Sequence, residues 1–532
     1  MIHAVLAVAV LLGVAAPPLG RAALPARELR GLEALVRAYD AILEARFDQV
    51  DAELKKACGP PAASERSAAS SKLAPREACD VLAATALWWR IQLDPESRAL
   101  DPEFSATADR AIAATEAWAE RAPDDAEAWF YMGGAYAARV QWRVLRGEKL
   151  AAARDGKRIL QALERAIELD PALDDAYFGM GMYKYYADVA PAAAKMLRFL
   201  LLLPGGDRKE GLEQMLRARA RGRLLQGEAD YQLSIIYLWY ERDTARAIEL
   251  LRSLHREYPG NPLFLAQIAE IQDTYLHDTT ASLATWRTLL AAAREHRANA
   301  PALTEAQARL AIARLLDRLH QTDQAIEHLQ TIVAQRPAAP FGALPLAYLR
   351  LGEAHDRLGQ RAQALEAYRS ALSLVPAPDV HAIRATATTR MRRGPDPRQA
   401  EAYRLSLEGW RRLEQNDLAG ASASLERSVA LHGNDPVTRY RMGRLLQARK
   451  EDAAALVQFE QTIRLARQCP PPVLGTAYLE AARLLERTGR RSEALSYYQI
   501  ASTLFGASAD THAAAARALT RLRAAGGRAP RD

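Results

Sequence analysis

The sequence predicts an all-α solenoid built from antiparallel helix pairs, and three observations lead to this fold class. Apolar residues recur every three or four positions along the 532-residue chain, which is the spacing of one buried helix face. Sustained alternation of Val, Ile, Thr and aromatic residues, which marks half-buried strands, is missing. Segments of about 34 residues repeat with small and large apolar residues at fixed positions, as in repeat architectures.

The composition is that of a folded protein. Hydrophobic residues make up 49% and charged residues 25%, with only 29 Gly and 27 Pro, so disordered and collagen-like classes are excluded. The net charge of +7 comes from 71 basic and 64 acidic residues that alternate along the helical stretches. Nucleic-acid binding calls for a basic block with interleaved aromatic residues, so no nucleic-acid partner is predicted.

The first 22 residues are predicted to be a secretory signal peptide. An apolar run extends from Ala4 to Ala16, and a small-residue stretch follows, with cleavage expected after Ala22 or Ala23. The run is shorter than the roughly 20 residues that a membrane-spanning helix needs, so the mature chain is predicted to have no transmembrane segment. The expected location is periplasmic or secreted, although the residues before the run include no Lys or Arg.

The three cysteines do not suggest a metal site. Cys58 and Cys79 flank a small, polar, Pro-containing loop, and in an oxidising compartment they are predicted to form a disulfide. Two reduced, buried thiols are the alternative. Cys469 is left unpaired in either case, and no Cys/His spacing is typical of zinc, so no metal or cofactor is predicted.

The clearest repeat unit extends from Tyr348 to Pro376. Its spaced residues are Tyr348, Leu351, Gly352 and His355, followed by Ala364, Tyr368, Ala371 and Pro376. A second pair of units is in register further on, because Gly409 and Gly443 are 34 residues apart, as are Leu425 and Phe459. This pattern resembles the tetratricopeptide repeat. The resemblance implies a right-handed superhelix with a concave groove that binds a peptide or helix of a partner protein.

The repeat register divides the chain into six parts. They are a signal peptide (1–22), a divergent helical segment (27–125), a solenoid segment (126–378), a linker or irregular repeat (379–400), a second solenoid segment (401–505) and a capping helix (506–525). The first two repeats of the solenoid are enlarged. In the first of them Ile159 follows Tyr136 by 23 positions where the repeat pattern has about 9, which indicates an insertion of about 14 residues.

The resemblance also predicts which residues line the concave groove. In the N-terminal repeats the inner positions of the first helices hold Phe130, Phe178, Met182, Tyr185, Tyr186, Gln232, Ile236, Trp239 and Tyr240. Aromatic side chains offer a large contact area with few rotors to freeze, which suits a peptide or a partner helix. The alternative is that the enlarged N-terminal repeats fold across their own groove and bury these rings.

The same positions are charged or polar in the C-terminal repeats. They are Glu353, Asp356, Arg357, Arg444, Gln447, Arg483, Glu486 and Arg487, and we expect them to bind charged termini or patches. The arginines of the linker, Arg390, Arg392 and Arg393, are expected to be solvated.

Two further segments have both a functional and a structural interpretation. The turn that contains Gly205, Gly206, Arg208 and Lys209 offers free backbone N–H groups and two cations to a phosphate or carboxylate. The alternative is an ordinary turn capped by Asp207. The Leu-rich insertion at 192–204 either touches a membrane surface or forms a buried helix.

A second resemblance covers about 90 residues. The segments YFGMGMYKYY, GGDRKEGL and YLWYE are similar to the eukaryotic tetratricopeptide family of mitochondrial outer-membrane inclusion-body clearance proteins. That family lacks a secretory signal like this one, so its location and role are not transferred to this chain.

No catalytic motif is found in the sequence. HExxH, GxSxG, GxxxxGK and GxGxxG are all missing, and the histidines are scattered among repeats without a paired ligand. We therefore predict a non-catalytic scaffold or adaptor, in the cell envelope or secreted, that binds a peptide or helix in its groove. The alternative is an envelope assembly factor that contacts lipid or outer-membrane proteins through the 192–204 insertion.

Overall fold

The computed structural model describes residues 28–59, 73–190 and 204–526 of the chain. Within these ranges there are 24 α-helices, one 3-10 helix and no strand, which confirms the predicted all-α fold. None of the described helices combines the length and the apolar character that a membrane span requires.

The helices of the first half are α1 (Leu32–Leu43), α2 (Phe47–Cys58), α3 (Arg76–Leu93), α4 (Asp101–Arg121), α5 (Ala126–Leu145), α6 (Lys149–Leu169), α7 (Ala176–Val189), α9 (Arg208–Arg221), α10 (Gln226–Trp239), α11 (Thr244–Glu257), α12 (Pro262–Thr274) and α13 (Thr279–Arg294). Those of the second half are α14 (Pro301–Arg318), α15 (Thr322–Gln335), α16 (Ala343–Arg357), α17 (Arg361–Ser373), α18 (Ile383–Arg392), α19 (Pro397–Glu414), α20 (Leu418–Leu431), α21 (Pro436–Ala448), α22 (Asp452–Arg464), η1 (Ala466–Gln468), α23 (Pro471–Arg487), α24 (Arg491–Thr503) and α25 (Ala509–Gly526).

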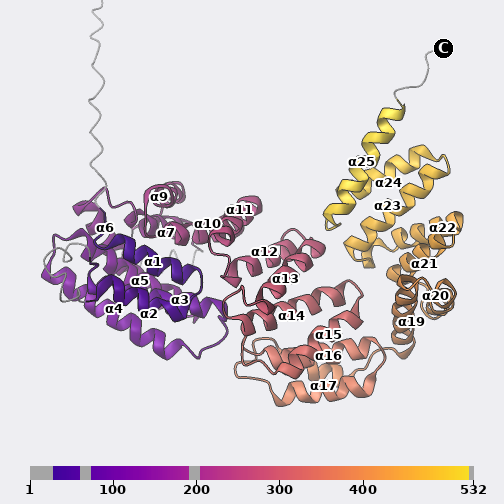
Figure 1. Cartoon of the computed structure of the whole chain (residues 1–532), viewed down its shortest axis with the longest axis horizontal. Coiled ribbons are helices and arrows are strands. Elements are labelled where there is room, and N and C mark those ends of the chain that lie inside the picture. The colour runs from indigo at the N-terminus through magenta and orange to yellow at the C-terminus, as the bar shows by residue number, and fades with distance from the viewer. Residues whose placement is uncertain (1–27, 60–72, 191–203, 527–532) are drawn as a thin grey trace, which may run out of the picture.

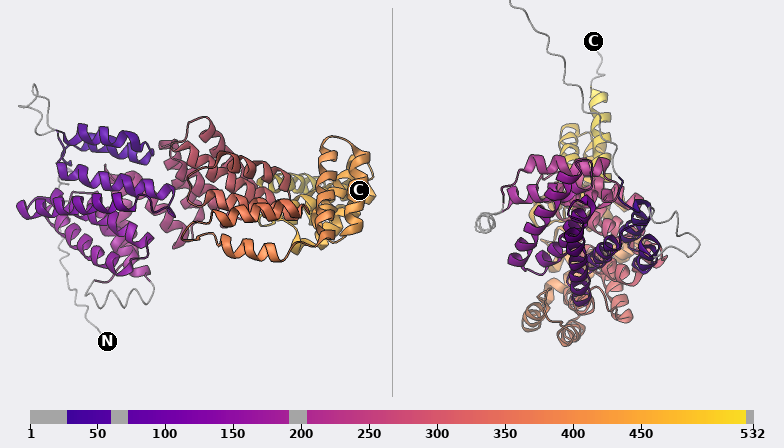
Figure 2. Two further views of the ribbon diagram at one scale, coloured as in Figure 1. Left: turned by 90° about the horizontal axis from the view of Figure 1, so that it is seen from below. Right: turned by 90° about the vertical axis from the view of Figure 1, so that its left-hand side faces the viewer.

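The helices pack as consecutive antiparallel pairs, from α5 with α6 to α23 with α24. The pairs follow an open arc that runs from the N-terminal helices, past α16 and α17, to α25 at the other end (Figure 1). Seen from the side in Figure 2, the chain is elongated and its N-terminal helices form the broadest part. This is the repeat solenoid that the sequence predicts.

Small residues set the distance between the two helices of a pair. A Cβ placed on Gly352 would lie 2.5 Å from the Tyr368 ring, and one on Gly443 would lie 2.6 Å from the Phe459 ring. Gly409 meets Leu425 in the same way at 2.6 Å. In all three pairs the large residue follows the glycine by sixteen positions. The small and large residues of the repeat pattern are therefore the contact between paired helices.

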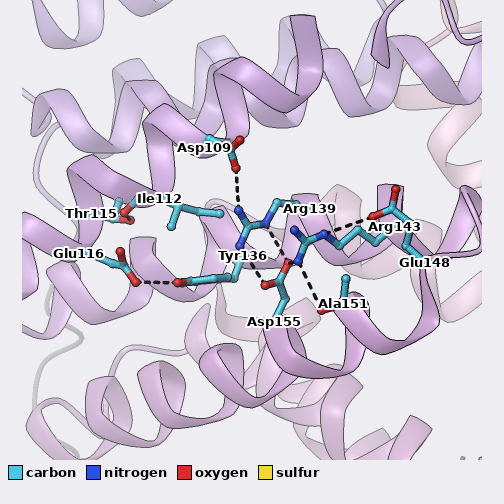
Figure 3. Close-up of polar contacts among 10 residues, drawn as sticks. All are labelled: Asp109, Ile112, Thr115, Glu116, Tyr136, Arg139, Arg143, Glu148, Ala151 and Asp155. Atoms are coloured by element: carbon cyan, nitrogen blue, oxygen red, sulfur yellow. Dashed lines mark hydrogen bonds and ion pairs between the residues drawn. The ribbon is translucent and has the colours of Figure 1, made fainter. Parts of the chain in front are cut away.

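The first repeat keeps this contact although its helices are longer. A Cβ on Gly133 would lie 2.9 Å from Leu163, which follows the glycine by thirty positions instead of sixteen. The additional fourteen positions equal the predicted insertion. They extend the C-terminal end of α5 and the N-terminal end of α6. Three polar side chains join the two extensions, because Arg139 and Arg143 both donate to the buried Asp155 (Figure 3).

The N-terminal segment packs across the first helices of the following pairs. The Trp89 ring of α3 lies 4.8 Å from the Tyr231 ring of α10 and 6.2 Å from the Phe264 ring of α12. The α1 helix is joined to the turn between α11 and α12, where the Asn261 amide donates to the Leu43 carbonyl at 2.7 Å. Helices α1 to α7 and α10 to α12 consequently contribute to one apolar core.

A buried carboxylate ties these helices together. Glu228 of α10 accepts hydrogen bonds from the Tyr39 hydroxyl of α1 at 3.0 Å and from the Trp89 indole of α3 at 2.9 Å. The Gln232 amide donates to its other oxygen at 3.1 Å. Burial raises the pKa of Glu228, since no cation offsets the loss of water.

The predicted linker is a short helix that packs against its neighbours. Helix α18 buries Ile383 and Ala387 in a small core with Tyr368 of α17. Beyond it, the second solenoid segment contacts the turn between α14 and α15. The buried Arg441 guanidinium donates to the His320 carbonyl at 2.7 Å, and the Thr322 and Tyr403 hydroxyls lie 2.7 Å apart.

The structure places a disulfide between Cys58 at the end of α2 and Cys79 in α3. It flanks residues 60–72, which lie outside the described part of the chain. Cys469 is free and buried, and burial raises the pKa of its thiol to about 12.

Substituting Gly181→Ala should destabilise the chain. A Cβ there would lie 2.6 Å from the Gly211 carbonyl oxygen and 2.9 Å from the Met215 amide nitrogen, so α7 and α9 would have to move apart. We expect the free energy of unfolding in urea to fall by about 1–3 kcal/mol. Gly156→Ala is the control, because its Cβ meets no atom within 4 Å, and it should raise stability by about 0.5–1 kcal/mol. Equal effects of the two substitutions would contradict the close approach.

The His320 imidazole should make stability depend on pH. Burial lowers its pKa from 6.5 to about 4, so the unfolded chain takes up a proton first as the pH falls. Between pH 6.5 and 4 the free energy of unfolding should therefore decrease by about 1–3 kcal/mol on account of this group. His320→Asn tolerates the left-handed backbone (φ 58°) and should remove this part of the pH dependence. Identical pH profiles of the two proteins in chemical denaturation would refute the assignment.

Candidate functional site

An open polar groove lies on the inner side of the second half of the arc. It has a volume of about 940 Å³ and is formed by α14, α15 and α16, with α18 and the segment after it as the opposite wall. We call it the arginine groove. Its charged lining residues are Arg314, Asp317, Arg318, Arg350, Glu353, Asp356, Arg357, Arg390 and Arg393.

Positive charge exceeds negative charge in the arginine groove. Among its described lining residues there are six arginines and three carboxylates. Ion pairs orient several of these side chains: Arg357 bonds Asp317 at 2.8 Å, and Arg350 bonds Glu353 at 2.8 Å. The planar guanidinium group can donate two parallel hydrogen bonds to a carboxylate. The groove is therefore suited to an acidic ligand.

Two arginines of the α18 wall contribute most of the excess charge. The Arg390 guanidinium lies 3.7 Å from Glu353, beyond ordinary hydrogen-bond distance. The exposed Arg393 has no ion pair with any described residue. Both side chains thus retain donors for a ligand.

Arg361 fixes the position of this wall. Its guanidinium donates to both oxygens of the buried Asp356 at 2.9 Å, and also to the carbonyls of Arg390 and Met391 at 3.0 and 2.6 Å. These last bonds satisfy carbonyl groups at the C-terminal end of α18, which lack partners within the helix. The Tyr368 hydroxyl also donates to Asp356 at 2.9 Å, and the bond together with burial raises the pKa of that tyrosine.

Two family models match the chain. Both carry the description tetratricopeptide repeat, and they match residues 228–261 and 345–378. The chain contains tetratricopeptide repeats. The second match covers α16 and α17, which supply Glu353, Asp356 and Arg357 to the arginine groove. No curated protein matches the sequence. Tetratricopeptide repeats are protein-interaction modules, so the chain is a scaffold for a protein partner.

Solved structures of other repeat proteins resemble the chain only distantly. A tetratricopeptide repeat protein of Parabacteroides merdae has 15% identity, covers 56% of this chain and 98% of its own, and has a TM-score of 0.25. The TPR2AB domain of yeast Sti1, in complex with pHSP90, has 15% identity over 57% and 99%, with a TM-score of 0.21. A human IFIT1 dimer with m7Gppp-AAAA has 14% identity over 81% and 80%, with a TM-score of 0.29. Scores this low carry no argument about a ligand.

The charged residues predicted from the repeat register fall into two groups. Glu353, Asp356 and Arg357 line the arginine groove. The remaining five bond to neighbouring residues of their own segment: Arg444 to Tyr440, Gln447 and Arg483 to Glu480, Glu486 to Tyr498, and Arg487 to Asp452. The sequence analysis missed Arg390 and Arg393 as groove residues, because α18 lies outside the repeat register. Arg392 is exposed and does not line the groove.

The predicted aromatic cluster is not an open groove. Phe130, Phe178, Tyr185, Gln232 and Ile236 are buried, and Met182 and Tyr186 are half-buried. Trp239 and Tyr240 have 61% and 39% of their surface exposed, whereas Phe130, Phe178, Met182 and Tyr186 line a cavity beside α5 and α6. The correction has a physical reason. Phe130 lies in the core that includes α1 and α3, whereas Phe178, Tyr185 and Ile236 lie in a second core formed by α7, α9, α10 and α11.

The three tyrosines of this cluster pack edge to face against one another, and one of them donates a hydrogen bond to a carboxylate. The rings of Tyr185, Tyr186 and Tyr240 meet edge to face, with centroids 5.6–5.9 Å apart. The Tyr185 hydroxyl donates to Glu241 at 2.5 Å, and the Arg208 guanidinium donates to both oxygens of Glu241 at 2.8 and 2.6 Å. These contacts are internal to the fold.

At the predicted anion site, which contains Gly205, Gly206, Arg208 and Lys209, carboxylates of the chain itself lie next to both cations. The side chain of Asp207 accepts from the Glu210 amide at 2.9 Å and caps α9. Arg208 pairs with Glu241, as described above, and Lys209 lies 3.9 Å from Glu213. The alternative of an ordinary capped turn therefore describes this segment.

Residues 192–203 of the Leu-rich insertion lie outside the described residues. Elsewhere in the described chain no group of three or more His, Cys, Asp and Glu side chains could hold a metal ion.

Substituting Arg361→Met should loosen the α18 wall. The substitution removes the bonds to Asp356 and to the two carbonyls while it retains much of the apolar stem. We expect faster backbone amide exchange in residues 383–394 by hydrogen–deuterium mass spectrometry, because an end that has lost its partners opens more often. Exchange in α5 and α6 should not change. Unaltered exchange in residues 383–394 would show that Arg361 does not hold the wall.

Proposed function

We propose that the chain is a non-catalytic interaction scaffold that binds an acidic peptide segment of a partner protein in the arginine groove. The observation that carries the proposal is the excess of guanidinium groups in the arginine groove, on helices that α1 and α3 do not cover. An extended acidic segment would place its carboxylates against Arg350, Arg390 and Arg393. Electrostatic attraction of this kind raises the association rate and selects against basic partners.

We also propose an oxidising location, either the periplasm or the exterior of the cell. The apolar N-terminal run with its small-residue cleavage region supports export. The bond between Cys58 and Cys79 supports it as well, since disulfides persist mainly in oxidising compartments.

Fluorescence anisotropy with a labelled octapeptide of alternating Leu and Glu tests the binding mode. The double substitution Arg390→Glu and Arg393→Glu should weaken binding by about tenfold or more, which corresponds to about 1.4 kcal/mol. Arg392→Glu is the control, because it makes half of this charge change at an exposed position of the same helix outside the groove, and it should change the affinity by less than about twofold.

A peptide with Gln in place of each Glu should bind at least about tenfold more weakly than the acidic peptide. The proposal fails if the acidic and neutral peptides bind equally well. It also fails if Arg392→Glu weakens binding as much as the double substitution does, because the attraction would then be a general effect of net charge.

A further inference from the structure

A large internal channel lies in the enlarged first repeats, far along the chain from the arginine groove. Its volume is about 730 Å³, within the range of roughly 300–1,000 Å³ that ligand sites occupy. Helices α5, α6 and α7 form its walls, and α3 and α10 complete it. Its described lining is predominantly apolar and includes Gly134, Gly156 and Gly179, and a Cβ on Gly156 would meet no atom within 4 Å.

The channel is long and narrow. Its lining residues follow α5 from Tyr131 to Val144 and α6 from Lys149 to Leu163. At 1.5 Å per helical residue, each wall is about 20 Å long. The hydrocarbon core of a bilayer is about 30 Å thick and holds two acyl chains end to end, so one chain spans about 15 Å. The channel can therefore hold a complete long acyl chain.

The two ends of the channel differ. At one end Leu163 and Phe178 are buried, and the Asp175 carboxylate accepts hydrogen bonds from three backbone amides at 2.9–3.1 Å. At the other end Val144 is 62% exposed and the Lys149 side chain is exposed without an ion pair to a described residue. The first end is thus closed and carries a negative charge, whereas the second is open and carries a positive charge.

Two buried donors in the lining have no partner. They are the Trp88 indole N–H and the Tyr131 hydroxyl, whose residues are only 8% and 2% exposed. Unpaired buried donors are rare in folded proteins, and these two mark positions beside the channel. Arg146 of α5 donates to the Pro95 and Ser97 carbonyls just after α3, so the C-terminal ends of α3 and α5 are adjacent. Trp88 consequently lies in the half toward the open end, and Tyr131 toward the closed end.

The open half is held by polar bonds outside the channel. Arg139 donates to both oxygens of Asp155 at 2.8 and 2.9 Å, and Arg143 donates to one of them at 2.5 Å. Arg139 also bonds Asp109 of α4 at 2.6 Å (Figure 3). These ion pairs fix the extended ends of α5 and α6 although few large side chains fill the space between them. The channel is thus part of the architecture of the enlarged repeat and not a local packing fault.

We propose that the channel binds a long-chain fatty acid. The hydrocarbon chain lies between α5, α6 and α7 and points to the closed end, where Asp175 excludes an anion. The carboxylate lies at the open end and pairs with the Lys149 ammonium, which has no ion pair with a described residue. Charge-assisted bonds of this type are stronger than neutral ones, so the acid binds better than the matching alcohol.

Isothermal titration calorimetry of the delipidated full chain with palmitate and with 1-hexadecanol tests the proposal. We expect palmitate to bind with one-to-one stoichiometry, and hexadecanol at least about fivefold more weakly. Gly156→Phe should abolish binding of both, because a Cβ at Gly156 points into open space and the ring then occupies the channel. Thermal unfolding of this variant checks that it is folded.

The surface substitution Lys149→Gln should weaken palmitate binding and leave hexadecanol binding nearly unchanged. Tyr131→Phe is the control for orientation, because it removes the unpaired hydroxyl of the closed end and should not change the affinity for palmitate.

Absence of palmitate binding to the wild-type chain overturns the proposal. So does retention of binding in folded Gly156→Phe, or a loss in Tyr131→Phe without a loss in Lys149→Gln. None of these outcomes depends on whether the arginine groove binds a peptide.

Discussion

The close approach of the two helices in each pair is the constraint on which the rest of the structure depends. At Gly352, Gly409 and Gly443 a Cβ would lie 2.5–2.6 Å from a side chain of the second helix, so only glycine lets the pair close. A closed pair still has an apolar face, which it can bury only against the next pair. Stacking therefore supplies the core, and it makes the first helices of successive pairs line one continuous inner face.

The chain uses this inner face in two ways. In the first half, α1 and α3 cover it and tie themselves to α10 through the buried Glu228. In the second half, the face of α14 and α16 remains open, and α18 is placed opposite to it by Arg361. The enlarged first repeats add a third feature, because fourteen extra positions in α5 and α6 make room for a channel that an ordinary pair is too short to form.

The sequence predicts local contacts well and contacts between distant segments poorly. The contact between a repeat glycine and the large residue sixteen positions later follows from the sequence spacing alone. The size of the first insertion does so as well, and so does the loop that separates Cys58 from Cys79. The burial of Tyr185 and Ile236 does not, because both side chains lie in a core that α7, α9, α10 and α11 share, and the repeat spacing does not show how tightly these helices close around it. Likewise, Arg390 and Arg393 line the groove because of the way α18 packs. The repeat spacing does not predict this packing, since α18 is not part of a repeat. The sequence does not predict the channel, because it does not distinguish Gly179, which packs closely against Leu163, from Gly156, which has open space beside it.

The central claim is that the open inner face of α14, α16 and α18 is where this scaffold binds its partner. Hydrogen–deuterium exchange of the full chain, with and without a saturating acidic peptide, tests it most directly because it reports every helix at once. The account predicts slower exchange in residues 301–318, 343–357 and 383–394, with little change in α5 to α7. Protection confined to the N-terminal pairs, or to α19 to α25, would contradict it.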